Sequence, residues 1–186
     1  MIRILALGLL LMSASPCAQA AQTPSPVPRA AIAREAFSNG WALWRSRFIA
    51  KDGRVVDTGN AGVSHSEGQG YGMLLAVLAD DPFTFDRLWA WTRSALMIRE
   101  DGLAAWRWDP ASTPRVADMN NASDGDLLIA WALAEAARSW NKPEHRDSAA
   151  RSAAALFASA VCSVNGERTL LPGAAGFTAE DRPDGR

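Results

Sequence analysis

The sequence has 186 residues, enough for one domain of ordinary size, and its formal charge of −1 argues against the basic surface of nucleic-acid-binding proteins. No histidine and cysteine spacing fits a metal site, and no phosphate-binding loop occurs. We therefore expect no nucleic-acid partner, no metal and no cofactor. Eight tryptophans against one tyrosine are unusual, because indole rings either fill cores or stack on flat partners such as sugar rings.

The N-terminus is predicted to be a secretory signal. Arg3 supplies the positive charge, residues 4–12 form a short apolar run, and Ala18-Gln19-Ala20 fits a cleavage site. Residues 1–20 are then removed by cleavage after Ala20, and the protein is expected in the periplasm or secreted. The apolar run is too short for a stable membrane anchor. Residues 21–28 form a proline-rich spacer.

Apolar residues recurring every three or four positions predict an all-α fold with four or five amphipathic helices. The helices are expected at 29–50, from 64–66 to 78, from 82 to 96, at 123–140 and at 144–161. Asp81 and Pro82 are typical of an N-cap and a first helical residue, and Ser66 with Gln69, or Ser64 with Glu67, fits a capping box. Only turns and loops are predicted past residue 161. Helices antiparallel to their chain neighbours would gather alternate loops at one end.

Three carboxylates at helix starts are the candidates for chemistry: Glu67, Asp124 and Asp126. Paired acids beside exposed tryptophans suggest glycoside hydrolysis, in which one acid protonates the leaving oxygen and another activates water or attacks the sugar. The alternative is that these residues only suit the helix dipole. An Asp124 that stays ionised would accept hydrogen bonds from sugar hydroxyls.

Three motifs, in order, resemble glycoside hydrolase family 8, also called cellulase family D. They are Asp52-Gly-Arg-Val-Val-Asp57, Ser66-Glu-Gly-Gln-Gly-Tyr-Gly-Met73, and Ala122-Ser-Asp-Gly-Asp126 leading to Trp140. The resemblance is strongest to the bacterial periplasmic endoglucanases encoded with cellulose synthase, and residues 170–177 share it.

The resemblance implies an (α/α)6 barrel that cleaves internal β-1,4-glucosidic bonds of cellulose with inversion. It implies that Glu67 is the proton donor and that Asp124 lies in the active site, where we expect it to grip and distort the sugar ring. The cellulose synthase machinery is a candidate partner. The candidate substrate-binding residues are Trp106, Trp108, Tyr71, Gln69 and Asp126, and either Trp106 or Trp108 matches the family's sugar-stacking tryptophan.

One departure from the family concerns length. Six helix pairs require twelve helices, and about five are predicted here, so residues 29–186 resemble the N-terminal part of the catalytic domain. The aspartate that acts as general base in the family has no counterpart in the sequence. Two alternatives to an active endoglucanase therefore remain: a truncated, inactive β-glucan-binding fragment, and a helical interaction scaffold without sugar chemistry.

Overall fold

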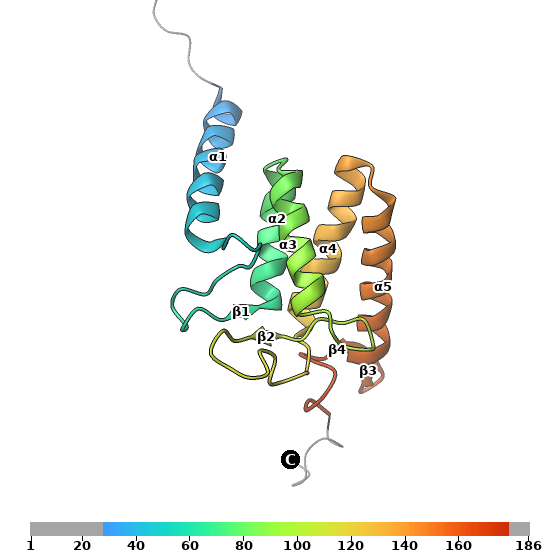
Figure 1. Ribbon diagram of the computed structural model, residues 1–186. Coiled ribbons are helices and arrows are strands. Elements are labelled where there is room, and N and C mark those ends of the chain that lie inside the picture. The colour runs from blue at the N-terminus through green and yellow to red at the C-terminus, as the bar shows by residue number, and fades with distance from the viewer. Residues whose placement is uncertain (1–27, 179–186) are drawn as a thin grey trace, which may run out of the picture.

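The computed structural model describes residues 28–178; the predicted signal peptide and most of the spacer lie outside this range. The helices are Arg29–Phe48 (α1), Ser66–Leu78 (α2), Pro82–Ala95 (α3), Ser123–Trp140 (α4) and Pro143–Ala160 (α5) (Figure 1). The strands are Ser64–His65 (β1), Arg107–Trp108 (β2), Val161–Val164 (β3) and Glu167–Leu170 (β4). The all-α prediction is confirmed, with two short antiparallel strand pairs, β1–β2 and β3–β4, added to it.

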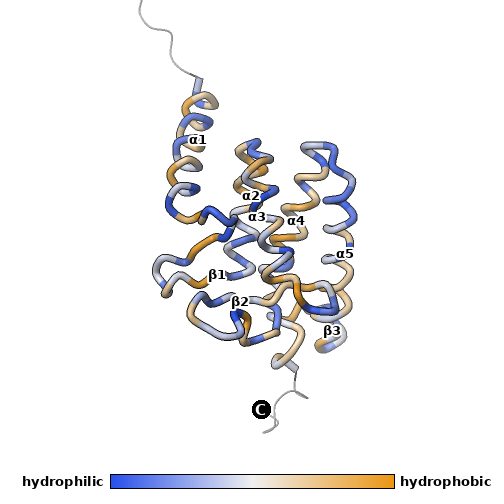
Figure 2. Tube along the Cα trace, viewed as in Figure 1, coloured by the Kyte–Doolittle hydropathy of each residue, from blue (hydrophilic) through white to orange (hydrophobic). Residues whose placement is uncertain are grey.

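Successive helices alternate in direction, so α2 and α4 begin at the same end of the molecule, where the short strands also lie (Figure 1). The opposite end carries the hydrophilic turn between α4 and α5 (Figure 2). Helices α2 and α4 also pack against each other, although α3 separates them in the chain. The predicted gathering of alternate loops at one end is therefore found.

Two glycines allow α2 and α4 to approach closely. A Cβ atom on Gly70 of α2 would lie 2.5 Å from Cβ of Leu128, and one on Gly125 of α4 would lie 2.8 Å from the backbone nitrogen of Glu67. Any side chain at either position would push the helices apart. The first turn of α4 therefore lies directly on the first turn of α2.

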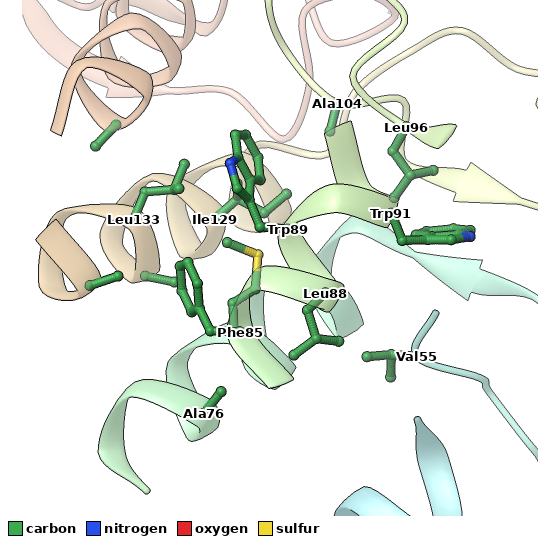
Figure 3. Packing of buried hydrophobic residues seen from close by; sticks show 14 of the residues in the cluster. Val55, Ala76, Phe85, Leu88, Trp89, Trp91, Leu96, Ala104, Ile129 and Leu133 are labelled. Carbon is green, nitrogen blue, oxygen red and sulfur yellow. The ribbon is translucent and has the colours of Figure 1, made fainter. Parts of the chain in front are cut away.

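The core lies between α2, α3 and α4 (Figure 3). Phe85 and Leu88 of α3 and Ile129 and Leu133 of α4 are at most 1% exposed. Burying side chains of this size stabilises the fold by about 1.5–3 kcal/mol each. This core fixes the two helices whose first turns carry the candidate acids.

Helix α1 packs at the edge through Trp41, its buried residue. Trp41 Nε1 donates to Asp81 Oδ2 at 3.2 Å, and Arg45 Nη1 donates to the same oxygen at 2.7 Å. Asp81 also caps α3 as predicted, because its Oδ1 accepts from the backbone nitrogen of Thr84 at 3.0 Å. One carboxylate thus ties α1 to the start of α3.

The start of α2 differs from the predicted capping boxes. The N-cap position is His65, with no side-chain cap, and Ser66 is the first helical residue. His65 pairs with Arg107 across β1–β2, and the backbone nitrogen of Ser66 donates to Trp106 O at 3.0 Å. The strand pair thus satisfies a donor that a capping side chain would otherwise have to satisfy.

The hairpin β3–β4 corrects the prediction of turns and loops past residue 161. Asn165 and Gly166 join its strands with φ values of 53° and 84°. Two successive positive φ angles are typical of a type I′ turn, for which Asn-Gly is the preferred sequence. The Asn-Gly pair is therefore a sequence signal for this hairpin, although only turns and loops were predicted here.

Candidate active site

Glu67 and Asp124 occupy the first turns of α2 and α4, and both side chains are exposed. The two helix starts can lie close together because Gly125 has no side chain, which leaves room for the backbone of Glu67. Asp124 Oδ1 accepts from the backbone nitrogen of Gly125 at 2.7 Å. Two carboxylates from separate motifs thus lie at the same end of the molecule, free to contact a ligand.

Trp106 connects these two helix starts. Its backbone carbonyl accepts from Ser66 N, and its backbone nitrogen donates to Asn120 O, both at 3.0 Å. Its indole Nε1 donates to Asp118 Oδ2 at 2.8 Å, and the ring stacks on His65 with centroids 5.8 Å apart. The indole is therefore held in a fixed orientation between α2 and α4.

A cleft of about 670 Å³ lies beside Asp124 and Trp106. One side comes from Trp106, from the loop before α4 and from α4 itself, and the other comes from the end of β4 and the segment after it. The lining residues are Trp106, Asp118, Asn120, Asn121, Ala122, Ser123, Asp124, Leu127, Leu170, Leu171, Pro172 and Phe177. Aromatic rings on both sides, together with carboxylates and amides, suit a sugar, which has apolar ring faces and a polar rim of hydroxyls.

Glu67 lies in a separate hollow of about 210 Å³, which it shares with Asp57, His65 and Tyr71. Tyr71 is 50% exposed, so its ring can meet a ligand there. His65 lines this hollow and Trp106 lines the cleft, and the two rings stack on each other. The structure therefore groups Glu67 with Tyr71 and groups Asp124 with Trp106.

The family model for glycosyl hydrolases family 8 matches residues 20–183. The chain belongs to glycosyl hydrolase family 8. A curated endoglucanase from Cellulomonas uda is 41% identical over 150 residues, which cover 81% of this chain and 42% of that protein. A probable endoglucanase from Novacetimonas hansenii is 42% identical, over 80% of this chain and 44% of that protein. The chain thus spans less than half the length of these relatives.

Solved structures of family 8 enzymes agree with the fold. The endo-β-1,4-glucanase of Acetobacter xylinum matches with a TM-score of 0.75 and 42% identity, over 78% of this chain and 46% of that one. The endoglucanase Cel10 of Klebsiella pneumoniae matches with a TM-score of 0.73 and 43% identity, over 74% and 44%. The predicted fold is therefore confirmed, since the helices match about half of an (α/α)6 barrel.

Two family 8 residues predicted to bind substrate have structural contacts instead. Gln69 is fully buried; its Oε1 accepts from Val55 N at 2.5 Å, and its Nε2 donates to Thr92 Oγ1 at 2.8 Å. Trp108 packs its edge against Trp91 and carries the guanidinium of Arg54 4.7 Å above its ring. Gln69 is therefore out of reach of a substrate, and Trp106, which lines the cleft, is the better sugar-stacking candidate.

The prediction that Asp126 binds substrate is also corrected, because Asp126 is only 2% exposed. Its Oδ1 accepts from Ala104 N at 2.7 Å, and its Oδ2 accepts from Asn121 Nδ2 at 2.9 Å. Burial raises the pKa of Asp126 to about 6, although both hydrogen bonds act to lower it. This carboxylate holds the loop before α4 in place and does not itself reach the cleft.

The stability of the fold should depend on pH through Asp126. Because its pKa is higher in the folded protein than in the unfolded chain, the folded state binds the proton more tightly between about pH 4 and 6. Its contribution is therefore most favourable below about pH 4, where the unfolded chain is protonated too, and it falls by roughly 3 kcal/mol by neutral pH. Urea unfolding should show this fall in the wild type and not in Asp126→Asn. Asp147→Asn, at an exposed carboxylate on α5, should keep the wild-type pH profile.

Asn121 was not predicted as a site residue, yet it lines the cleft and binds Asp126. The only sequence signal for Asn121 is weak: a polar run, Asp118-Met119-Asn120-Asn121, in a segment without periodicity before a helix start.

No cluster of acidic, histidine or cysteine side chains within residues 28–178 could hold a metal ion. Over the same range, no helix has the length and apolarity needed to cross a membrane.

Proposed function

We propose that this chain supplies the proton donor and a sugar-binding cleft of an endo-β-1,4-glucanase. The observation that carries the proposal is the pair of exposed acids, Glu67 and Asp124, on adjoining first turns of α2 and α4. The names of the curated relatives, endoglucanase and probable endoglucanase, support the same activity.

In the proposed reaction, the carboxylic acid of Glu67 donates its proton to the glycosidic oxygen as the bond from that oxygen to the anomeric carbon breaks. Asp124 accepts hydrogen bonds from hydroxyls of the sugar that keeps the anomeric carbon, and so holds its ring in a distorted shape. Water attacks the opposite face, which inverts the configuration. We assign none of residues 28–178 to the base that removes the proton from this water.

A non-catalytic β-glucan-binding role is the alternative, which the aromatic side chains lining the cleft also favour. Release of reducing ends from carboxymethylcellulose, followed together with retardation in a gel containing that polymer, separates the two. Retardation with hydrolysis supports the glucanase. Retardation without hydrolysis supports the binding role, and the absence of both would contradict both proposals.

Trp106→Ala should weaken binding of cellohexaose at least about tenfold, because it removes an indole already fixed by His65 and Asp118. Isothermal titration measures the change. Phe83→Ala removes another exposed aromatic ring, at the start of α3, and should leave binding unchanged. Equal losses in both variants would contradict a stacking role for Trp106.

We also propose that the protein is exported, to the periplasm or beyond, and cleaved after Ala20. The charged start, short apolar run and Ala-x-Ala pattern support this. Mass spectrometry of protein from a periplasmic fraction should give Ala21 as the first residue, and a protein retaining Met1 there would contradict cleavage.

The proposed activity could serve either of two biological roles. Beside the cellulose synthase machinery, the enzyme would trim a newly made glucan strand; acting on external cellulose, it would degrade that polymer. The sequence resemblance favours the first.

A further inference from the structure

The second wall of the cleft, residues 171–177, is held by the loop that precedes α4 and by the first residue of α4. Three hydrogen bonds join them: Ser123 N to Pro172 O at 2.8 Å, Asn120 Nδ2 to Ala175 O at 2.9 Å, and Ala174 N to Asn121 Oδ1 at 2.6 Å. The backbones also meet directly, since a Cβ atom on Gly173 would lie 2.7 Å from Asn121 O. Leu171 N also donates to Ala160 O, at the end of α5, at 2.8 Å. The part of the wall that carries Phe177 thus takes its position from the loop and the first residue of α4.

Asn121, which makes two side-chain bonds in this contact, is buried at 3% exposure. Its Nδ2 donates to Asp126 Oδ2, and its Oδ1 accepts from Ala174 N. A side-chain amide carries a donor nitrogen and an acceptor oxygen on one planar group, so Asn121 can make both bonds at once without a change of protonation. Asp126, fixed in turn by Ala104 N, determines which way the amide of Asn121 points.

We propose that Asn121, oriented by Asp126, is a positioning residue that sets the second wall of the cleft and thereby the affinity for glucan. The inference rests on the proposed function, because it takes a β-1,4-glucan as the ligand of the cleft. It adds a role for two residues that do not themselves perform the chemistry. The same chain of bonds explains why a carboxylate is buried at Asp126, where it cannot reach a sugar.

An exchange of the two side chains tests this directly. Asn121→Asp removes the donor and places two carboxylates together, while Asp126→Asn places two amide donors together or forces Asn121 to turn away from Ala174. The double variant N121D/D126N restores all three bonds: Asp at 121 accepts from Ala174 N and from Asn at 126, which accepts from Ala104 N. Asn121→Ala removes both bonds of Asn121 without adding a charge.

Two measurements apply to each variant: hydrogen exchange at the Ala174 amide without glucan, and cellohexaose affinity by titration. Each single variant should exchange at least about tenfold faster at Ala174 and bind at least about tenfold more weakly. The double variant should return to within about threefold of the wild type in both. Asn165→Asp makes the same substitution in the β3–β4 turn and should change neither.

The inference is overturned if the double variant is as impaired as the singles combined, or if Ala174 exchange stays at the wild-type rate in all of them. A fall in melting temperature without a selective change at Ala174 would also overturn it, since it would indicate a general role in folding. If the wild type fails to bind cellohexaose while Ala174 follows the expected pattern, the proposed function fails and the positioning of the wall stands.

Discussion

Under the proposed function, replacing Glu67 by glutamine should lower hydrolysis of carboxymethylcellulose by about 10²–10⁴-fold, because glutamine cannot donate a proton to the leaving oxygen. Binding should persist, since glutamine keeps the size of the side chain and its exposed position on α2. The measurements are reducing-end release and cellohexaose titration on the same preparation. A loss of kcat with little change in binding identifies a group that acts in the transition state.

Glu144→Gln provides the matched control, because Glu144 is also an exposed glutamate in the first turn of a helix, here α5. Helix α5 begins at the end of the molecule opposite the starts of α2 and α4 (Figure 1). Any general effect of removing a carboxylate from a helix start would appear in both variants. Unchanged hydrolysis in Glu67→Gln would remove Glu67 from the role of acid.

Gly125→Ala should both destabilise the protein and impair the site. The new methyl carbon would lie 2.1 Å from Ser66 Oγ and 2.8 Å from Ser66 Cβ and Glu67 N. The hydroxyl can rotate away, but the backbone cannot, so α2 and α4 must separate. Overpacking of this kind costs about 1–3 kcal/mol, and a displacement near 1 Å between catalytic groups can lower turnover about 10²-fold. Urea unfolding and the carboxymethylcellulose assay measure the two effects.

Gly40→Ala is the control for this change. Gly40 lies in α1, and a Cβ atom there would meet nothing within 4 Å. The same substitution should therefore raise the free energy of unfolding by about 0.5–1 kcal/mol, since alanine favours helix more than glycine does. Destabilisation in Gly40→Ala, or none in Gly125→Ala, would contradict the steric explanation.

The helices could be predicted because their signals are local. Asp81 and Pro82 mark the start of α3 by chemistry that needs no distant partner. The start of α2 was predicted less well, because the backbone donor of Ser66 is satisfied by Trp106, forty residues along the chain. A capping motif is a local pattern, and a strand formed from distant residues replaced it.

Prediction of the site residues from sequence is limited in the same way, because local motifs do not show which side chains become buried. Glu67 and Asp124 were predicted from motif position, and both are exposed at helix starts. Gln69 and Asp126 belong to the same motifs, yet both are buried, because helical spacing turns them toward neighbouring elements. Which face of a helix start meets solvent depends on packing, and the sequence contains no local record of it. Likewise, only the position of the cleft, which Trp106 lines and Trp108 does not, favours Trp106 as the sugar-stacking residue.

The backbone bonds of Trp106 also determine where this part of the protein can accept new sequence. Residues 109–115 form a loop that follows β2. The two ends of this loop are joined, since Asp109 N donates to Arg115 O at 2.8 Å. Trp106 is held by Ser66, Asn120 and Asp118, none of which lies in this loop. Loop extension costs only about 0.6 kcal/mol per doubling of length. Residues 110–114 are therefore a natural point for grafting a peptide or a second binding module beside the sugar cleft without moving the acids.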